Sequence, residues 1–186
     1  MRIDFREFLA YKFYNSLFVG LSVGSIFTLY APLEPSVYSL GGIALAFGML
    51  LVAKLYSKIL NINAFYWISL YVELVIFGAV VWFLLFAYNY ATALLFYVGY
   101  QLTFVFGSYL VRAETLFFPK HALLSMLDAV KQKAYLAGMF LSYGFYLACE
   151  KLYDMSDKGE QVYAIHFLLL ACEIVTIHKL LRAFKQ

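Results

Sequence analysis

The feature that most constrains this chain is a series of six apolar stretches, each about as long as a bilayer is thick. They cover residues 13–31, 36–57, 62–86, 89–111, 134–152 and 161–183. A helix needs roughly 20 apolar residues to cross the hydrocarbon core of a membrane, whereas a strand of a membrane barrel shows about 10 residues with strict alternation. The stretches are long and continuously apolar, so we expect an all-α, polytopic membrane protein with six transmembrane helices.

Composition and connections favour the same class. Hydrophobic residues make up 65% of the chain and charged residues 13%, whereas soluble domains have roughly 45–50% and about 25%. No connection is rich in Gly or Ser, so we expect a single domain over residues 1–186. In the longest connection, Pro119 marks a break, and the apolar residues after it predict a helix that leads into residues 134–152.

The basic residues are distributed unevenly between the two ends of the predicted bundle. All Lys and Arg residues except Lys151 and Lys158 fall on the side of the termini. Because cytoplasmic segments carry the excess of Lys and Arg, we expect both termini in the cytoplasm and the protein in the cytoplasmic (inner) membrane. Residues 1–12 are expected to lie along the cytoplasmic membrane surface. The basic residues form no dense cluster, so the expected partner is the lipid bilayer and no nucleic acid.

Three polar side chains fall near the middle of three different stretches. At about 1.5 Å per helical residue, Glu73 lies about 16 Å into its stretch, and Gln101 and Glu173 lie about 18 Å into theirs. A charged side chain at the bilayer centre costs from roughly 2.5 to more than 10 kcal/mol, so such residues normally face the bundle interior or a wet cavity. We therefore expect Glu73 to find its partner in Gln101, Glu173 or a ligand.

Each of these residues belongs to a polar stripe at helical spacing. Burial disfavours the ionised form of a carboxyl group, and a second carboxylate nearby disfavours it further. Such a pair is suited to binding a proton in one conformation and releasing it, or exchanging it for a cation, in another. The alternative is that each Glu is protonated and only bridges helices. The stripes are Tyr66, Ser69 and Glu73; Tyr97, Gln101 and Ser108; His166, Glu173 and Thr176; and, in the first stretch, Asn15, Ser22 and Ser25.

Other motifs point to packing and not to catalysis. The sequence has no CxxC, no His/Cys cluster, no nucleophile elbow and no phosphate loop, so we expect no enzyme activity, no metal and no cofactor. His166 and His178 lie about 18 Å apart on one stretch, which disfavours haem ligation. Small residues at four-residue spacing bring helices into close contact, either within the chain or between two copies. They include Gly20 and Gly24, and Ala134, Gly138 and Ser142.

The segment "GMLLVAKLYSKILN" carries Lys54 and Lys58 between the second and third stretches. With six helices, cytoplasmic termini and short outer loops, the chain resembles one half of a major facilitator superfamily transporter. The loop of that family typically reads G-x-x-x-D-R/K-x-G-R/K-R/K; here Lys54 and Lys58 match basic positions, while Ala53 and Tyr56 replace the Asp and the second Gly. The segment "LLSMLDAVKQKAYLAGMFLSYGFY" also looks like the fifth helix of that family.

The resemblance implies alternating access, with the solute held between two six-helix halves. A parallel homodimer, or another membrane subunit, would supply the second half.

The leading hypothesis is a proton- or cation-coupled secondary transporter of a small solute, assembled as a homo-oligomer of half-transporters. The alternative is a non-catalytic scaffold or accessory subunit of a membrane complex, whose small-residue faces bind a partner protein. For transport, the residues expected to bind substrate or protons are Glu73, Gln101, Glu173, His166, Tyr66 and Tyr97, and those expected to form a gate are Arg112, Glu114, Lys54 and Lys58.

Overall fold

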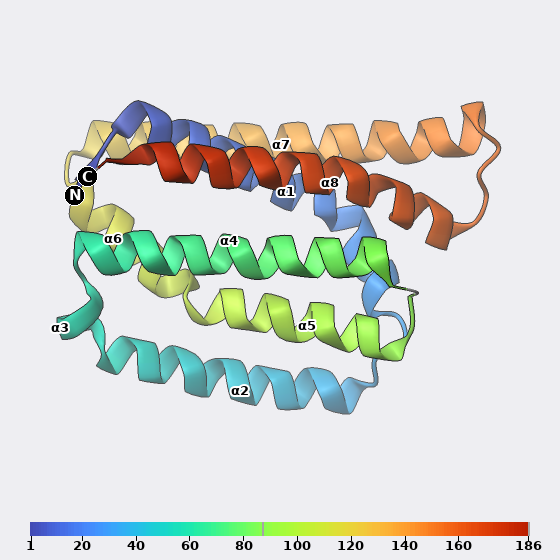
Figure 1. Cartoon of the computed structure of the whole chain (residues 1–186), viewed down its shortest axis with the longest axis horizontal. Coiled ribbons are helices and arrows are strands. Elements are labelled where there is room, and N and C mark those ends of the chain that lie inside the picture. Colours follow the sequence, from blue (N-terminus) through green and yellow to red (C-terminus); the bar gives the residue numbers. More distant parts are fainter. Residues whose placement is uncertain (87, 186) are drawn as a thin grey trace.

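The computed structural model describes residues 1–86 and 88–185, and long helices lying side by side make up nearly all of it (Figure 1). Two short strands, β1 (Arg2–Ile3) and β2 (Phe184–Lys185), pair the two ends of the chain. The helices are α1 (Phe5–Tyr30), α2 (Pro35–Lys54), α3 (Tyr56–Ile59), α4 (Ile62–Leu85), α5 (Tyr90–Val105), α6 (Gly107–Phe117), α7 (His121–Leu152) and α8 (Lys158–Ala183).

Five helical segments are long and apolar enough to cross a membrane: α1, α2, α4, the combined α5–α6 segment and α8. They coincide with five of the six predicted spans, which supports the class of multi-pass membrane protein. The predicted span 134–152 is the second half of α7, which is not among the five. Only residues 134–149 separate Lys133 from Glu150. That is about 24 Å of helix, shorter than a hydrocarbon core of about 30 Å.

Side-chain caps explain where several helices begin. The Asp4 carboxylate accepts hydrogen bonds from the backbone N–H groups of Arg6 (3.1 Å) and Glu7 (3.3 Å) at the start of α1. Asn61 caps α4 and Asp157 caps α8 in the same way. A capping oxygen satisfies one of the free N–H groups of the first turn. As a result, α8 begins at Lys158, three residues before the predicted apolar stretch.

The N-terminal segment is part of the bundle, and no turn separates it from the first predicted span. Helix α1 runs without interruption from Phe5, and the side chains of Phe8 and Tyr11 are buried. The Phe8 ring lies 5.0 Å from the ring of Phe118 and 5.8 Å from that of Phe65, measured between centroids. These aromatic contacts explain why the first turns of α1 stay with the other helices.

The predicted fourth span is divided in two. Helix α5 ends at Val105, and α6 begins at Gly107 after a local departure from helical geometry at Phe106 (φ −92°, ψ −3°). The break predicted at Pro119 is confirmed, since α6 ends at Phe117 and α7 begins at His121. The residue before a proline is disfavoured in the helical conformation, which places the end of α6 before Phe118.

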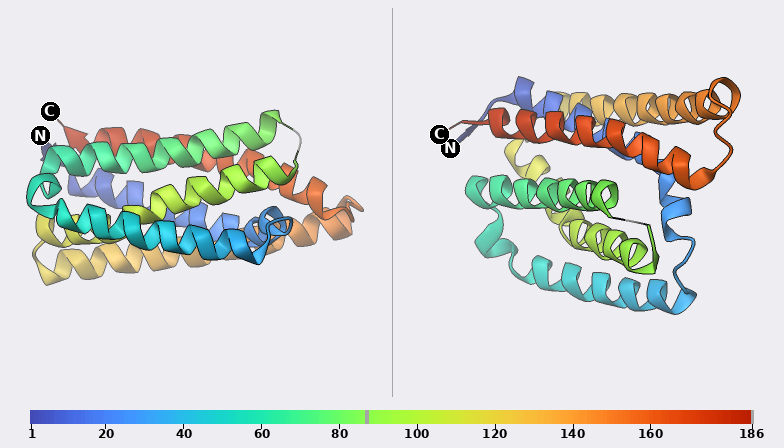
Figure 2. Two further views of the ribbon diagram at one scale, coloured as in Figure 1. Left: turned by 90° about the horizontal axis from the view of Figure 1, so that it is seen from below. Right: turned by 45° about the vertical axis from the view of Figure 1, so that its right-hand side comes forward.

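Helix α1 holds the bundle together, because it packs against both α7 and α8. Helix α4 packs against α8 and α5, and α2 forms the outer layer on α5 (Figure 2). Only Val52 of α2 is buried. Helix α2 thus contributes little to the interior. The buried carboxylates described below belong to α4 and α8, which lie further inside.

Glycines allow the close approach of α1 and α7. A Cβ atom added to Gly20 would collide with the carbonyl oxygen of Tyr135 and lie 3.0 Å from the Cα atom of Gly138. A Cβ atom added to Gly138 would collide with the carbonyl oxygen of Leu17 in the same way. The two backbones are thus in direct contact, the packing that small residues at four-residue spacing predict. This contact between Gly20 and Gly138 lies within one chain and not between two copies.

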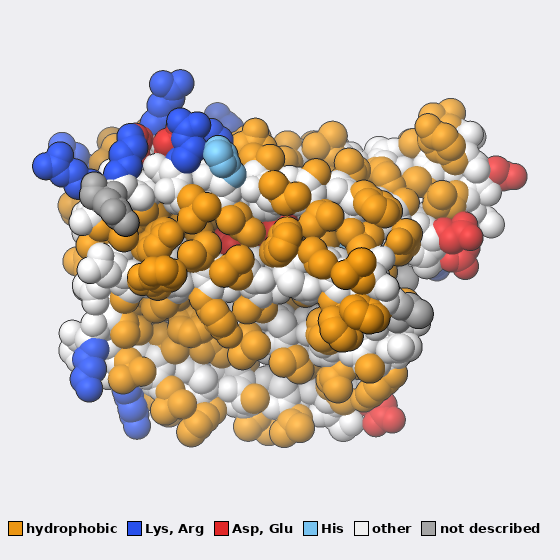
Figure 3. Space-filling model, viewed as in Figure 1, with side chains coloured by type: hydrophobic (Ala, Val, Ile, Leu, Met, Phe, Trp, Pro, Cys, Tyr) orange, Lys and Arg blue, Asp and Glu red, His pale blue; other side chains and the backbone are white. Residues whose placement is uncertain are grey.

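The two ends of the chain are fastened together. β1 and β2 are antiparallel, with Ile3 opposite Phe184, and the Asp4 N–H donates to the carbonyl oxygen of Ala183 (2.8 Å). The Lys185 ammonium lies 2.7 Å from the Asp4 carboxylate. Figure 3 shows that most of the Lys and Arg side chains visible on this face gather at the end that carries both termini, and the exposed acidic ones mainly at the other.

The ion pair between Asp4 and Lys185 makes the contact between the two ends of the chain sensitive to acid. The hydrogen bond from Lys185 is the main cause that holds the pKa of Asp4 below its ordinary value of 3.8. A lowered pKa means that the contribution to stability is complete above about pH 3.8 and is lost as pH falls through the folded-state pKa. We expect Asp4→Asn, which keeps the cap, to speed hydrogen exchange at Ile3 and Phe184 at neutral pH. The difference from wild type should vanish in strong acid. A pH-independent difference would contradict this assignment.

Candidate functional site

The carboxylate of Glu73 is buried between α4 and α1. Its side chain is 1% exposed. The Tyr11 hydroxyl donates a hydrogen bond to Oε1 of Glu73 (2.6 Å), and the Asn15 amide nitrogen lies 3.1 Å from Oε1 and 3.3 Å from Oε2. Tyr11 and Asn15 are four residues apart, so they lie on one face of α1. Two neutral donors therefore hold one carboxylate inside the bundle.

Glu173 of α8 lies beside Glu73 but has no such support. It is also 1% exposed. Neither of its carboxylate oxygens accepts a hydrogen bond from any residue in the described part of the chain. The two carboxyl groups are close enough for each to influence the charge of the other. Burying a carboxylate without donors is costly unless it carries a proton or binds a cation. The pair is thus asymmetric, with donors on one side only.

Further polar atoms in the interior lack partners. Within residues 1–86 and 88–185, Oγ of Ser69, Oε1 of Gln101 and the hydroxyl of Tyr146 are buried without a hydrogen bond. Ser69 lies one turn before Glu73 on α4. Buried polar atoms without partners are uncommon in folded proteins and often mark places where water, an ion or a ligand binds. The carboxylate pair is therefore one part of a wider polar interior.

A second charged cluster, formed by Lys12, Glu114 and Lys131, lies next to the pair. The Lys12 ammonium is 2.7 Å from Oε1 of Glu114, and the Lys131 ammonium contacts Oε2. The side chains of Lys12 and Glu114 are only 7% and 5% exposed. The Lys12 ammonium also lies 4.8 Å from the centre of the Tyr11 ring, whose hydroxyl binds Glu73. The cluster joins α1, α6 and α7, and Tyr11 connects it to the carboxylate pair.

Tyr97 and Tyr66 make their contacts away from this pair, and Gln101 forms no hydrogen bond with it. The Tyr97 hydroxyl donates to the carbonyl oxygen of Tyr38 (3.1 Å), which fixes α2 on α5. The half-buried ring of Tyr66 packs against Phe184, with centroids 5.3 Å apart. Gln101 is half-buried on α5, and among the described residues it makes no hydrogen bond to Glu73 or Glu173. These three side chains serve helix packing or remain unsatisfied in the conformation described.

His166 lies two turns before Glu173 on α8, closer to the acidic end of the molecule. Its side chain is 1% exposed, and Nδ1 lies 2.6 Å from the carbonyl oxygen of Val162. The His166 ring packs on the ring of Phe83 with centroids 4.0 Å apart. Seven residues on a helix correspond to about 10 Å. His166 therefore shares a helix face with Glu173 but belongs to a separate layer.

The residues expected to form a gate also divide. Arg112, Lys54 and Lys58 are exposed. Helices α6 and α3, which carry Arg112 and Lys58, lie toward the end of the bundle that carries the termini (Figure 1). Glu114 pairs with Lys12 and Lys131, and no ion pair with Arg112 is formed among the described residues. Of the four, only Glu114 is part of a buried charge network.

Sequence reasoning identified both glutamates but not all of their surroundings. It placed Asn15 on a polar stripe, and it treated Tyr11 and Lys12 as part of a surface segment. The signal was present in the spacing, because Tyr11, Asn15 and Ser22 fall at four- and seven-residue intervals on α1. The partnership of Lys131 with Glu114 depends on the way α7 folds back beside α1 and could not be read from spacing.

The arrangement can hold and exchange a proton or a monovalent cation. When hydrogen-bond donors surround only one carboxyl group of a pair, that group is favoured to carry the negative charge and the other group is favoured to carry the proton. Among residues 1–86 and 88–185, no group of three His, Cys, Asp or Glu side chains could hold a metal ion. No protein-family model, curated protein or solved structure matches this chain.

Proposed function

We propose that this chain is a secondary transporter of a small solute, coupled to protons or cations through Glu73 and Glu173. The observation that carries the proposal is the carboxylate of Glu173, which is 1% exposed, lies beside Glu73 and accepts no hydrogen bond from a described residue. Buried ionisable residues in membrane helices are costly and commonly form ion pathways and proton relays.

The donors suggest which carboxyl group carries the proton. Tyr11 and Asn15 stabilise a negative charge on Glu73, whereas no donor stabilises one on Glu173. In the resting state, Glu173 then holds the proton and Glu73 is ionised. The neighbouring Lys12 ammonium also interacts electrostatically with Glu73 and favours a negative charge there. Loss of the proton would leave an unpaired negative charge, which a cation or a cationic solute neutralises.

In this proposal, α7 crosses the membrane as the sixth span, and both termini lie in the cytoplasm of a cell bounded by an inner membrane. Two observations support it: α7 packs along α1, and the basic side chains gather where the termini lie. The resemblance to half of a major facilitator transporter suggests a parallel homodimer that works by alternating access. The pathway would then run between the copies.

The alternative of a scaffold or accessory subunit has less support. That hypothesis predicts that Gly20 and Gly138 contact a partner protein. In the structure, both glycines lie in the contact between α1 and α7 of the same chain. The hypothesis also predicts carboxyl groups that bridge helices; Glu73 does so through Tyr11 and Asn15 of α1, and among the described residues Glu173 does so only through Glu73.

The first test is infrared difference spectroscopy of the purified protein in lipid as pH is changed between about 5 and 11. We expect a band from a protonated carboxylic acid that responds to pH, and we expect Glu173→Gln to remove it. Glu150→Gln changes an exposed carboxylate of α7 and serves as the matched control. If wild type lacks the band, or if Glu173→Gln retains it unchanged, Glu173 is not the proton-binding group.

The second test is transport by reconstituted protein. We expect Glu73→Gln and Glu173→Gln to abolish solute-dependent proton movement in proteoliposomes, because a neutral amide cannot cycle a proton. The variants should elute as wild type does in size-exclusion chromatography, since each replaces a carboxyl group with an amide of similar size. Normal coupled transport by both variants would refute the assigned mechanism.

A further inference from the structure

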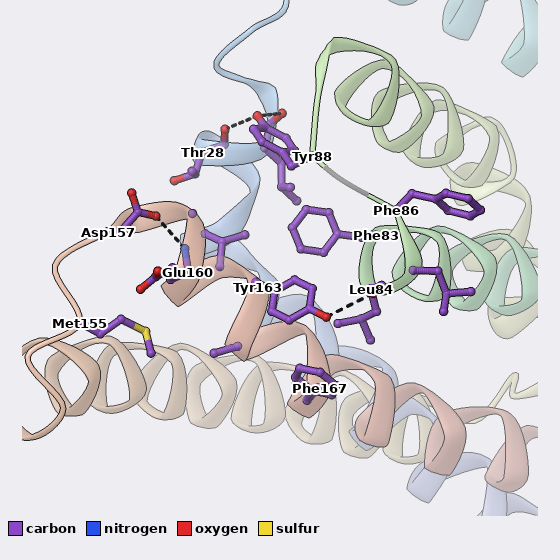
Figure 4. A pocket seen from close by; sticks show the side chains of 15 residues that line it. Thr28, Phe83, Leu84, Phe86, Tyr88, Met155, Asp157, Glu160, Tyr163 and Phe167 are labelled. Carbon is purple, nitrogen blue, oxygen red and sulfur yellow. Dashed lines mark hydrogen bonds between the residues drawn. The ribbon is translucent and has the colours of Figure 1, made fainter.

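A groove opens at the end of the molecule opposite the termini (Figure 4). It has a volume of about 760 Å³ and lies between the ends of α1 and α4, the residues Phe86 and Tyr88, and the start of α8. Sites for small organic ligands commonly have volumes of about 300–1,000 Å³. The groove is therefore large enough for a compact organic molecule.

Aromatic rings form much of its wall. Phe83 lies at the centre of the groove, between Tyr88 and Tyr163. The Tyr88 hydroxyl donates to the carbonyl oxygens of Thr28 and Leu29, both at 2.9 Å, and the Tyr163 hydroxyl donates to that of Leu84 (3.3 Å). These bonds occupy the hydroxyl groups and hold the rings in place. Phe86 and Phe167 complete the aromatic lining.

Among the described residues that line the groove, the charged ones are Asp157 and Glu160, and none is Lys, Arg or His. Both acidic residues lie on the side formed by the start of α8 (Figure 4). Within the described part of the chain, neither carboxylate forms an ion pair; Asp157 accepts a hydrogen bond from the Glu160 N–H (2.9 Å) as the helix cap. An aromatic cleft with two acidic residues at its edge, and no basic residue among its described lining, is complementary to a molecule with a positive centre on an apolar body.

We propose that this groove binds an amphipathic organic cation. Aromatic faces attract cations, and the attraction grows when the cation is withdrawn from water. The two carboxylates provide the counter-charge. A lipid tail would cover the rings but leave both carboxylates without a counter-charge, and an organic anion would be repelled by them.

A layer of packed rings lies between the groove and the buried carboxylates. Phe83 lines the groove and packs directly on His166, which lies two helical turns before Glu173. The layer of Phe83 and His166 thus separates the groove from the site proposed for coupling. That the bound cation is also the transported solute rests on the proposed function. The binding itself depends only on the groove.

The test uses two probes of equal shape and opposite charge, tetraphenylphosphonium and tetraphenylborate. Binding to the full chain in nanodiscs is measured by calorimetry, with protein-free nanodiscs as the reference for partition into lipid. We expect saturable binding of the cation and none of the anion. Asp157→Asn with Glu160→Gln keeps a capping side chain at position 157 and should weaken cation binding about three- to ten-fold. Glu150→Gln is the control and should bind as wild type does.

Equal binding of both probes, or no effect of the double variant, would overturn the proposal. Glu73→Gln and Glu173→Gln should leave this binding intact, because they lie beyond the layer of Phe83 and His166. The two hypotheses can therefore fail separately. If the groove does not bind cations, saturable binding of tetraphenylphosphonium will be missing. If Glu173 is not the proton-binding group, the pH-dependent carboxyl band will be missing or will survive in Glu173→Gln.

Discussion

Replacing Gly138 with Leu is expected to prevent the chain from forming a stable bundle. Any side chain at this position meets the backbone of α1, since a Cβ atom would collide with the carbonyl oxygen of Leu17 and lie 2.9 Å from the Cα atom of Gly20. Overpacking against side chains typically costs about 1–3 kcal/mol, because those side chains can move. Here the obstacle is backbone, so α1 and α7 must separate. We expect a cost above that range.

The measurement is the yield of monodisperse protein and its thermal unfolding in a mild detergent. Gly144→Leu is the matched control, because Gly144 lies on the same helix and a Cβ atom there meets nothing within 4 Å. It should behave as wild type does. Equal stability of the two variants would show that α1 and α7 do not cross at Gly20 and Gly138.

Replacing Glu114 with Gln is expected to destabilise the fold by about 3–5 kcal/mol, the usual cost of removing one partner from a buried ion pair. The change keeps the size of the side chain but leaves the Lys12 ammonium, which is 7% exposed on its side chain, without its counter-charge. Lys131 is less affected, because it is partly exposed and also lies 3.5 Å from Asp128. The loss of stability in Glu114→Gln should therefore come mainly from the unpaired charge of Lys12.

A second variant separates charge from packing. Lys12→Met with Glu114→Gln removes both members of the buried pair and should recover much of the stability, because an apolar replacement no longer needs a counter-charge. Asp128→Asn, at an exposed position, should change the free energy of unfolding by less than about 0.5 kcal/mol. If the double variant were less stable than Glu114→Gln alone, the buried Lys12 charge would not be the cause.

Much of the fold follows from apolar length. Five predicted stretches became span-length helices because continuous apolar sequence in a helical chain leaves little alternative. What apolar length could not show was where hydrogen bonding extends a helix into charged sequence. Helix α1 begins at Phe5, eight residues before the predicted stretch, because Asp4 caps its first turn.

The site was predictable in part. Depth in the membrane identified Glu73 and Glu173, since helical rise converts sequence position into height. Height does not give direction around the bundle. Tyr97 and Gln101 were therefore grouped with the glutamates, although the structure places Tyr97 against α2 and makes Tyr11 and Asn15 the partners of Glu73.

The pairing of β1 with β2 has a consequence for how such a chain could be duplicated. Its two ends emerge side by side from the same end of the bundle. A short linker from the end of one copy to the start of the next would join two copies pointing the same way, without an additional membrane crossing. An inverted pair could not be joined so directly. Tandem fusion of this chain therefore favours a single polypeptide with two parallel halves related by rotation about the membrane normal.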